Sequence, residues 1–232
     1  MKKLAILLLA LFFAMEANAQ QNGASEVNYS SDLQKIATIK SKGRILVIKQ
    51  EYQIPAAQFF GNYAKELGLS SAEDMVLRDE TARGTNKTYR YGQMYHGVPI
   101  EGATMVLHEK NGVVTYANGV IIRDFYRPFT PVVQSEEAIA TALLNTRATK
   151  YAWENESMEQ DLKMVRNDEK ATYYPTPRLI FFDPQFSTDA RNYRLAYEVN
   201  VFAIEPLESH TYYIDATTGE ILKSVKKIKT LM

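Results

Sequence analysis

His108 and Glu109 lie in a stretch, VLHEKNG, that begins like the zinc signature H-E-x-x-H. In that helical signature two histidines four residues apart bind zinc on one face, and the glutamate between them acts as a general base. Position 112 is a glycine here, so the second histidine ligand is missing. Asn111-Gly112 is instead the dipeptide that best adopts the positive φ angles of a two-residue hairpin turn, and alternating apolar residues flank it. We therefore predict a hairpin, with His108 on a strand.

The other polar residues show no catalytic or metal-binding pattern. The chain has no cysteine and no G-x-S-x-G motif, and its three histidines lack ligand spacing: His96, His108 and His210. A three-histidine zinc site assembled in space is the enzymatic alternative, but satisfied or exposed histidines are far commoner. Glu198, Asp215 and Glu220 look like a set of paired carboxylates, yet a turn and exposed strand positions explain them better. We therefore predict no catalytic residue, no metal ligand and no cofactor.

The N-terminus has the pattern of a secretory signal peptide. Lys2 and Lys3 precede an apolar run from Leu4 to Met15. This run is shorter than the roughly 20 residues that span a bilayer. The small-residue pattern Ala-Asn-Ala ends at Ala19, so we expect cleavage between Ala19 and Gln20 and no stable membrane insertion. We therefore expect an exported protein, periplasmic or extracellular.

The composition of the mature chain excludes some partners. Removal of the first 19 of the 232 residues leaves 213, enough for one large or two small domains. Loss of Lys2, Lys3 and Glu16 from the 27 basic and 27 acidic residues leaves 25 and 26. This balance gives no electrostatic footprint for nucleic acid or for an anionic membrane surface. The 15 tyrosines and 10 phenylalanines favour a β-rich fold.

The first half of the mature chain predicts an arm, one helix and a sheet. We expect a loose arm over residues 20–50, with a short strand at 45–48. Pro55 suits a first helical turn and Gly68 a left-handed cap, and between them apolar residues recur at four-residue spacing: Phe59, Tyr63 and Leu67. From residue 75 to residue 122 the period changes to two, which predicts three or four antiparallel strands with three tyrosines on one face: Tyr89, Tyr91 and Tyr95.

The second half repeats this plan after a proline-rich boundary at residues 127–133. Ser135 can cap a helix, and the highly charged segment 154–170 is typical of a solvated loop or an edge hairpin. Strands are predicted at 177–184 and from Tyr193 onward, where alternate residues form one apolar face: Tyr193, Leu195, Tyr197, Val199 and Val201. A turn over 215–219 precedes a final strand. The fold class is α+β, with two consecutive units of a helix plus an antiparallel sheet.

These residues resemble two known families. YRYGQMYHGVPIEGATMVLHEKNGVVTYANG is similar to the fungalysin/thermolysin propeptide (FTP) domain, whose hallmark is an aromatic-rich strand followed by G-V-P-[IV]-x-G; the matching residues are Tyr91, Gly97, Val98, Pro99, Ile100 and Gly102. LAYEVNV and HTYYIDATTGEILKS resemble the PepSY domain, which has a cystatin-like fold; the matching residues are Tyr197, Glu198, Tyr213, Asp215, Gly219 and Glu220. Most of these residues suit turns and bulges, so we assign them structural roles.

Together the two motifs resemble the prodomain of thermolysin-like zinc metallopeptidases. The resemblance implies that the chain covers the substrate cleft of such a peptidase and helps it to fold, in cis in a longer precursor or in trans. The catalytic domain with H-E-x-x-H, which follows the PepSY segment in that family, is absent from this sequence. The expected organisation is a signal peptide (1–19), an arm (20–50), an FTP-like domain (51–126), a PepSY-like domain (134–225) and a tail (226–232).

Two alternatives to this inhibitor and chaperone function remain open at this point. The first is a cell-envelope binding module that reuses the same two domains, because function belongs to sites rather than to folds. The second, which is the least favoured, is an enzyme in its own right.

Overall fold

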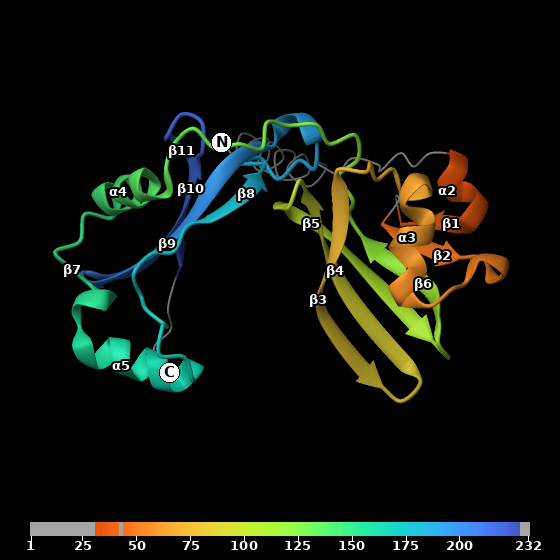
Figure 1. Ribbon diagram of the computed structural model, residues 1–232, viewed down its shortest axis with the longest axis horizontal. Coiled ribbons are helices and arrows are strands. Elements are labelled where there is room, and N and C mark those ends of the chain that lie inside the picture. Colours follow the sequence, from red (N-terminus) through yellow and green to blue (C-terminus); the bar gives the residue numbers. More distant parts are fainter. Residues whose placement is uncertain (1–30, 42–43, 228–232) are drawn as a thin grey trace, which may run out of the picture.

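The computed structural model describes residues 31–41 and 44–227 (Figure 1). These residues form an α+β structure with four α-helices and a mixed, mostly antiparallel open sheet. The elements up to residue 119, which we call the first lobe, are α2 (Ser31–Ile36), β1 (Ala37–Lys40), β2 (Ile45–Ile48), η1 (Gln50–Tyr52), α3 (Ala56–Leu67), β3 (Glu73–Arg83), β4 (Asn86–Tyr95), β5 (Val98–Lys110) and β6 (Val113–Gly119).

The elements from residue 135 onward form the second lobe. In chain order they are α4 (Ser135–Thr146), β7 (Lys150–Tyr151), η2 (Ala152–Glu154), α5 (Glu156–Arg166), β8 (Arg178–Phe182), η3 (Ala190–Asn192), β9 (Arg194–Glu205), β10 (Leu207–Asp215) and β11 (Ile221–Lys227). Within the described ranges no helix is long and apolar enough to cross a membrane.

Helix α3 has the start and stop signals that the sequence predicts. Pro55 is its N-cap residue with φ −58°, which the proline ring imposes. Gly68 ends the helix at φ 80°, a left-handed angle that glycine adopts without a Cβ penalty. The Leu69 amide then donates to the Ala64 carbonyl at 2.8 Å, so the last turn is satisfied. The predicted helix is confirmed.

The VLHEKNG stretch forms a hairpin turn. Asn111 and Gly112 have φ angles of 53° and 83°, and Lys110 pairs with Val113 across the turn. Two consecutive positive φ angles are typical of the type I′ turn that matches strand twist. The predicted hairpin between β5 and β6 is therefore confirmed, and His108 is a strand residue.

The first lobe contains an antiparallel sheet in the order β3-β4-β5-β6-β2-β1. Helices α2 and α3 cover one face of this sheet (Figure 1). The buried residues between them form the first core: Leu33, Ile36, Ala37, Leu46, Ile48, Ala56, Phe59, Leu67, Tyr91, Met105, Leu107, Val114, Ala117 and Ile121.

The second lobe contains an antiparallel sheet in the order β8-β9-β10-β11, with β7 paired to β9. The predicted apolar face is confirmed, because Tyr193, which directly precedes β9, and the alternate β9 residues from Leu195 to Val201 are buried in this lobe's core. That core also takes residues from the first lobe and from the connecting segment: Tyr95, Val98, Ile100, Ala103, Ile122 and Phe125.

Strands β5 and β8 join the two lobes. Ile100 pairs in parallel with Phe181, and this is the one parallel pairing among the described strands. The Phe181 ring is fully buried, with its centroid 4.9 Å from that of Phe125 and 5.9 Å from that of Tyr95. The lobes form an arch around this junction, with α3 and α4 on the outer sides and the helix-free sheet faces turned toward the space between the lobes (Figure 1).

The charged segment 154–170 differs from its prediction. It contains helix α5, so the prediction of a loop or edge hairpin was wrong. Asn155 caps the helix by accepting a hydrogen bond from the Met158 amide at 3.3 Å, and Asn167 ends it at φ 48°. No residue of α5 is buried, which is why its composition looks like that of a solvated loop.

One smaller difference from the prediction occurs at the start of each lobe. From Ser31 onward the arm is not loose: Leu33 of α2 is fully buried, and Ala37 of β1 pairs with Ile48 of the predicted strand. Apolar residues in this part of the arm complete the first core, a tertiary contact that local composition does not reveal. In the second lobe Gln134, rather than Ser135, is the N-cap residue of α4. The Ser135 hydroxyl instead donates to Glu136 at 2.9 Å.

Candidate interaction site at the junction of the two motifs

The glycine that opens the G-V-P motif forms a tight turn. His96 and Gly97 have φ angles of 47° and 78°, and the flanking Tyr95 and Val98 pair with each other. As at the other hairpin, two positive φ angles in a row favour glycine at the second position. The turn directs β5 back along β4 and toward the second lobe.

The rest of this motif produces a break in strand pairing. Pro99 pairs with β4, and pairing resumes only at Thr104. Between these positions Gly102 adopts φ 81°, and Ile100 turns to its partner Phe181 on β8. A bulge with a left-handed glycine re-aims a strand in this way. The motif therefore has a structural consequence, which is to connect β5 to the second lobe.

Gln93 fixes the point where the chain leaves the first lobe. Its side chain is fully buried, and its amide nitrogen donates to the Ile122 carbonyl at 2.7 Å. The Ile122 amide donates back to the Gln93 side-chain oxygen at 2.8 Å. Gln93 also donates to Glu73, a buried carboxylate that accepts two further bonds from Ser70. Because each partner is satisfied inside the protein, this network holds the connecting segment in one position.

The acidic residue of the PepSY motif organises a turn. Oδ1 of Asp215 accepts hydrogen bonds from the Thr217 and Thr218 amides at 2.8 and 2.9 Å. Its Oδ2 lies 2.6 Å from Nε of Arg194, and its side chain is 1% exposed. Gly219 has φ 77° and donates to the Asp215 carbonyl. The carboxylate thus bonds its own turn backbone, as its position predicts.

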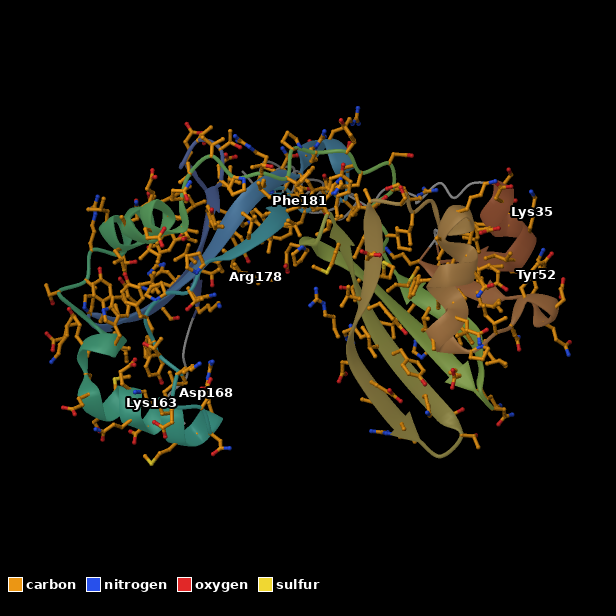
Figure 2. The ribbon with its side chains drawn as sticks, in the orientation of Figure 1. Lys35, Tyr52, Lys163, Asp168, Arg178 and Phe181 are labelled. Carbon is orange, nitrogen blue, oxygen red and sulfur yellow. The ribbon has the colours of Figure 1, made fainter. Side chains whose placement is uncertain are left out.

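Arg178 brings the two motifs together. Its Nη2 atom lies 3.1 Å from the Glu101 carboxylate in the G-V-P-I-E-G segment, and its Nε lies 2.9 Å from the Glu198 carboxylate of L-A-Y-E-V. Figure 2 places Arg178 on the side of the junction that faces the space between the lobes, and Phe181 at the junction itself. One guanidinium therefore connects acidic residues of both sequence motifs.

Tyr213 completes this cluster. Its ring stacks on that of Phe182 with a centroid separation of 3.8 Å and an interplanar angle of 2°. Burial, together with the nearby carboxylates of Glu198 and Glu101, raises the pKa of the Tyr213 phenol above its usual value. The phenol therefore stays neutral near neutral pH. We call Glu101, Arg178, Glu198 and Tyr213 the junction cluster.

Each of the three histidines has its own separate surroundings, and they do not form a metal site together. His108 contacts the side-chain oxygen of Asn118 at 2.6 Å, His210 lies 3.3 Å from Glu208, and His96 is exposed at its turn. Among residues 31–41 and 44–227, no group of three His, Cys, Asp or Glu side chains could hold a metal ion.

The structure brings only part of the predicted motif residues together. Glu198 and Tyr213 belong to the junction cluster, whereas Tyr91 packs on Phe60 of α3 and Glu220 is exposed beside Thr218. The predicted cleavage residues Ala19 and Gln20 lie outside the described residues. Sequence reasoning missed Arg178 and Gln93; the one signal for Arg178 was a cation at the start of an otherwise apolar strand.

Family models match both motifs. The model of the Fungalysin/Thermolysin Propeptide Motif matches residues 75–120. The model of the Peptidase propeptide and YPEB domain matches residues 133–225. The YpeB C-terminal domain of Bacillus megaterium aligns structurally at 14% identity and a TM-score of 0.34, covering 81% of this chain and 73% of that one.

Curated relatives include a neutral protease, a thermolysin and a bacillolysin. The chain is 30% identical to the thermostable neutral protease NprT of Geobacillus stearothermophilus over 146 residues, which is 60% of this chain and 23% of the relative. It is 26% identical to a thermolysin of Alicyclobacillus acidocaldarius over 68% of this chain and 26% of the relative. Bacillolysin of Bacillus amyloliquefaciens is 24% identical over 98% of this chain and 42% of its own length.

The chain thus spans about a quarter to two fifths of the length of these relatives. It matches only their propeptide portions, and no catalytic domain is evident in it. The chain carries FTP and PepSY domains and is homologous to the N-terminal propeptide region of thermolysin-like proteases.

Proposed function

We propose that the chain is a propeptide-type inhibitor and folding chaperone of a thermolysin-like metallopeptidase, in cis within a longer precursor or in trans. The observation that carries this proposal is the homology, because an FTP and a PepSY domain occur in this order and alignment with bacillolysin covers 98% of the chain. The shared core and the junction cluster support it, since they join both domains into one body that a partner can contact at once.

The shape of the arch is suited to such a contact. Both helix-free sheet faces are turned toward the space between the lobes (Figure 1). A stable protein complex buries about 800 Å² on each partner, which two sheet faces can supply. Binding across the substrate cleft would block peptide entry, and binding to a partly folded peptidase would lower the barrier that makes such enzymes kinetically stable.

Inhibition kinetics test this proposal. We expect the activity of a thermolysin-like peptidase from the same source to fall as the chain is added, and the inhibition to be competitive with a peptide substrate. Slow recovery should follow as the peptidase digests exposed segments such as residues 166–170. Unchanged activity at micromolar concentrations of the chain, for every peptidase of that source, would remove the inhibitor half of the proposal.

The alternative is a binding module of the cell envelope. The PepSY model covers the YPEB domain as well as peptidase propeptides, so this family is not restricted to peptidase precursors. Both functions require export, which the N-terminal sequence predicts. Mass mapping of the N-terminus of secreted material tests that point: Gln20 should be the first residue, and retention of the first 19 residues would contradict export by cleavage.

A further inference from the structure

An aromatic hollow lies in the segment that connects the two lobes. Tyr126, Phe129 and Val132 are 82%, 42% and 68% exposed. Single exposed apolar residues are normal on protein surfaces, but two of these three, Tyr126 and Phe129, line one hollow together. The hollow has a volume of about 340 Å³ and is lined by Tyr95, His96, Tyr126, Arg127, Pro128, Phe129 and Thr130. This volume is at the lower end of those of binding sites, which run from about 300 to 1,000 Å³.

The connecting segment is held at both ends, so these rings have fixed positions. Phe125 is buried against the rings of Phe181 and Tyr193, with centroids at 4.9 and 5.6 Å. At the other end the amides of Val132 and Val133 both donate to the Ala216 carbonyl, at 2.8 and 2.9 Å. An anchored loop loses little conformational entropy when it binds a partner. The exposed rings are therefore held in fixed positions on the surface.

The FTP turn forms one wall of the hollow. The His96 ring stacks on Phe129 with a centroid separation of 4.0 Å and an interplanar angle of 18°. Tyr95 contributes its ring edge to Phe129 at 6.2 Å from within the core. The hollow therefore exists only where the turn of one domain meets the segment that leads to the other. This connecting segment runs along the convex side of the arch (Figure 1).

The charge of the lining is positive. Nε of Arg127 donates to the Ala190 carbonyl at 3.0 Å and Nη1 to the Tyr126 carbonyl at 3.1 Å, so the guanidinium is positioned by neutral partners. Arg127 forms no ion pair within the described part of the chain, and none of the lining residues is acidic. The nearby Asp189 carboxylate is bound by Arg191. An incoming carboxylate therefore meets a cation beside aromatic rings, and the Asp189 carboxylate offsets part of the charge of this cation.

We propose that this hollow binds a segment of a protein partner that carries a leucine or phenylalanine next to an aspartate or glutamate. The apolar side chain inserts between Tyr126 and Phe129, and the carboxylate pairs with Arg127. Buried aromatic and arginine side chains supply most of the energy of protein interfaces, which this composition matches. The proposal rests on the proposed function in one respect, namely that the partner is the peptidase, of which one segment reaches this hollow in addition to the contact with the helix-free sheet faces.

A peptide titration tests the site without any peptidase. The probe is acetyl-Ala-Leu-Glu-Ala-amide, added to the ¹⁵N-labelled chain to ~10 mM, which detects Kd values in the millimolar range. We expect shifts of the backbone amides of Tyr126, Arg127, Phe129 and Thr130 and of His96; Pro128 has no backbone N–H. Replacement of Leu by Ala or of Glu by Lys in the peptide should weaken binding at least tenfold. Absence of shifts at these residues, or equal binding of the lysine peptide, would overturn the proposal.

Two variants and a matched control connect the site to the peptidase. Tyr126→Ala and Arg127→Gln should each raise the inhibition constant at least tenfold, whereas Leu144→Ala, which shortens an exposed side chain (78%) of the outer helix α4, should not change it. Circular dichroism confirms that each variant is folded. If the chain inhibits and both variants inhibit equally, this proposal fails while the proposed function stands.

If the chain inhibits no peptidase, the proposed function fails, and the peptide titration alone decides whether the hollow binds this ligand chemistry. Self-association through the patch is the competing outcome. Sedimentation would then show a dimer that Tyr126→Ala converts to monomer, and that result would contradict a heterologous partner.

Discussion

Replacement of Phe181 by alanine should weaken the connection between the two lobes. The side chain is fully buried at the parallel pairing of β5 with β8, and its ring contacts Phe125 and Tyr95 edge-on. Phenylalanine-to-alanine changes in cores cost about 3–5 kcal/mol. Burial of roughly 200 Å² of aromatic surface at ~25 cal/mol per Å² gives about 5 kcal/mol as an upper bound. We therefore expect Phe181→Ala to lower the free energy of unfolding by about 3–5 kcal/mol.

Two probes show whether this loss separates the lobes. The single tryptophan, Trp153, stacks on Tyr151 and reports on the second lobe, while hydrogen exchange of β4 and β5 amides reports on the first. In guanidinium titrations the unmodified chain should give coincident transitions, and Phe181→Ala should give separate ones. Phe59→Ala, in the core of the first lobe alone, should reduce the stability by a similar amount without affecting the Trp153 environment before that lobe unfolds. A loss below about 1 kcal/mol, or coincident transitions in Phe181→Ala, would refute the shared core as the connection.

The remaining predictions concern turns, helix entropy and an exposed ion pair. Gly112→Val should destabilise the chain by about 1–3 kcal/mol, because a β-branched residue is strained at φ 83°. Gly61→Ala in α3, where an added Cβ meets no atom within 4 Å, should stabilise the chain by about 0.4–1 kcal/mol. Thermal unfolding measures both changes, and equal effects of the two variants would contradict the backbone argument. The hydrogen bond from Arg191 lowers the pKa of Asp189 from 3.8 to about 2, so the stability it contributes is complete above pH 3.8 and is lost as the pH falls toward 2. A carboxyl NMR titration should show this pKa return toward 3.8 in Arg191→Ala, and an unchanged pKa would exclude the pair as its cause.

Most helices, strands and turns could be predicted because turn dipeptides and apolar periodicity depend only on neighbouring residues in the sequence. The dipeptide Asn111-Gly112 requires positive φ angles wherever it occurs in a hairpin, and alternation along β9 places its apolar residues in one core. The same reasoning failed for α5, where eleven mostly polar residues form a helix that buries none of them. Met158, Leu162 and Val165 recur at helical spacing and Asn155 caps the helix, but the many charged residues around them made the segment resemble a loop.

The junction cluster could not be predicted because its members are far apart in the sequence. Arg178 bonds to a carboxylate 77 positions away and to another 20 positions away. The motif residues Glu198 and Tyr213 were identified, but only the pairing of β8 with β5 and β9 shows that they meet Arg178. Gln93 looked like one polar residue among tyrosines, and its role depends on the backbone of Ile122, which no local pattern places nearby.

Refolding of a denatured thermolysin-like peptidase in the presence of this chain tests the central proposal most directly. The yield of active enzyme, measured after removal of the chain by proteolysis, should rise with the concentration of added chain and saturate near one chain per peptidase. Phe181→Ala should support a lower yield because its two lobes are not held together. A yield that stays at the level without the chain, for every peptidase of the same source, would contradict the account.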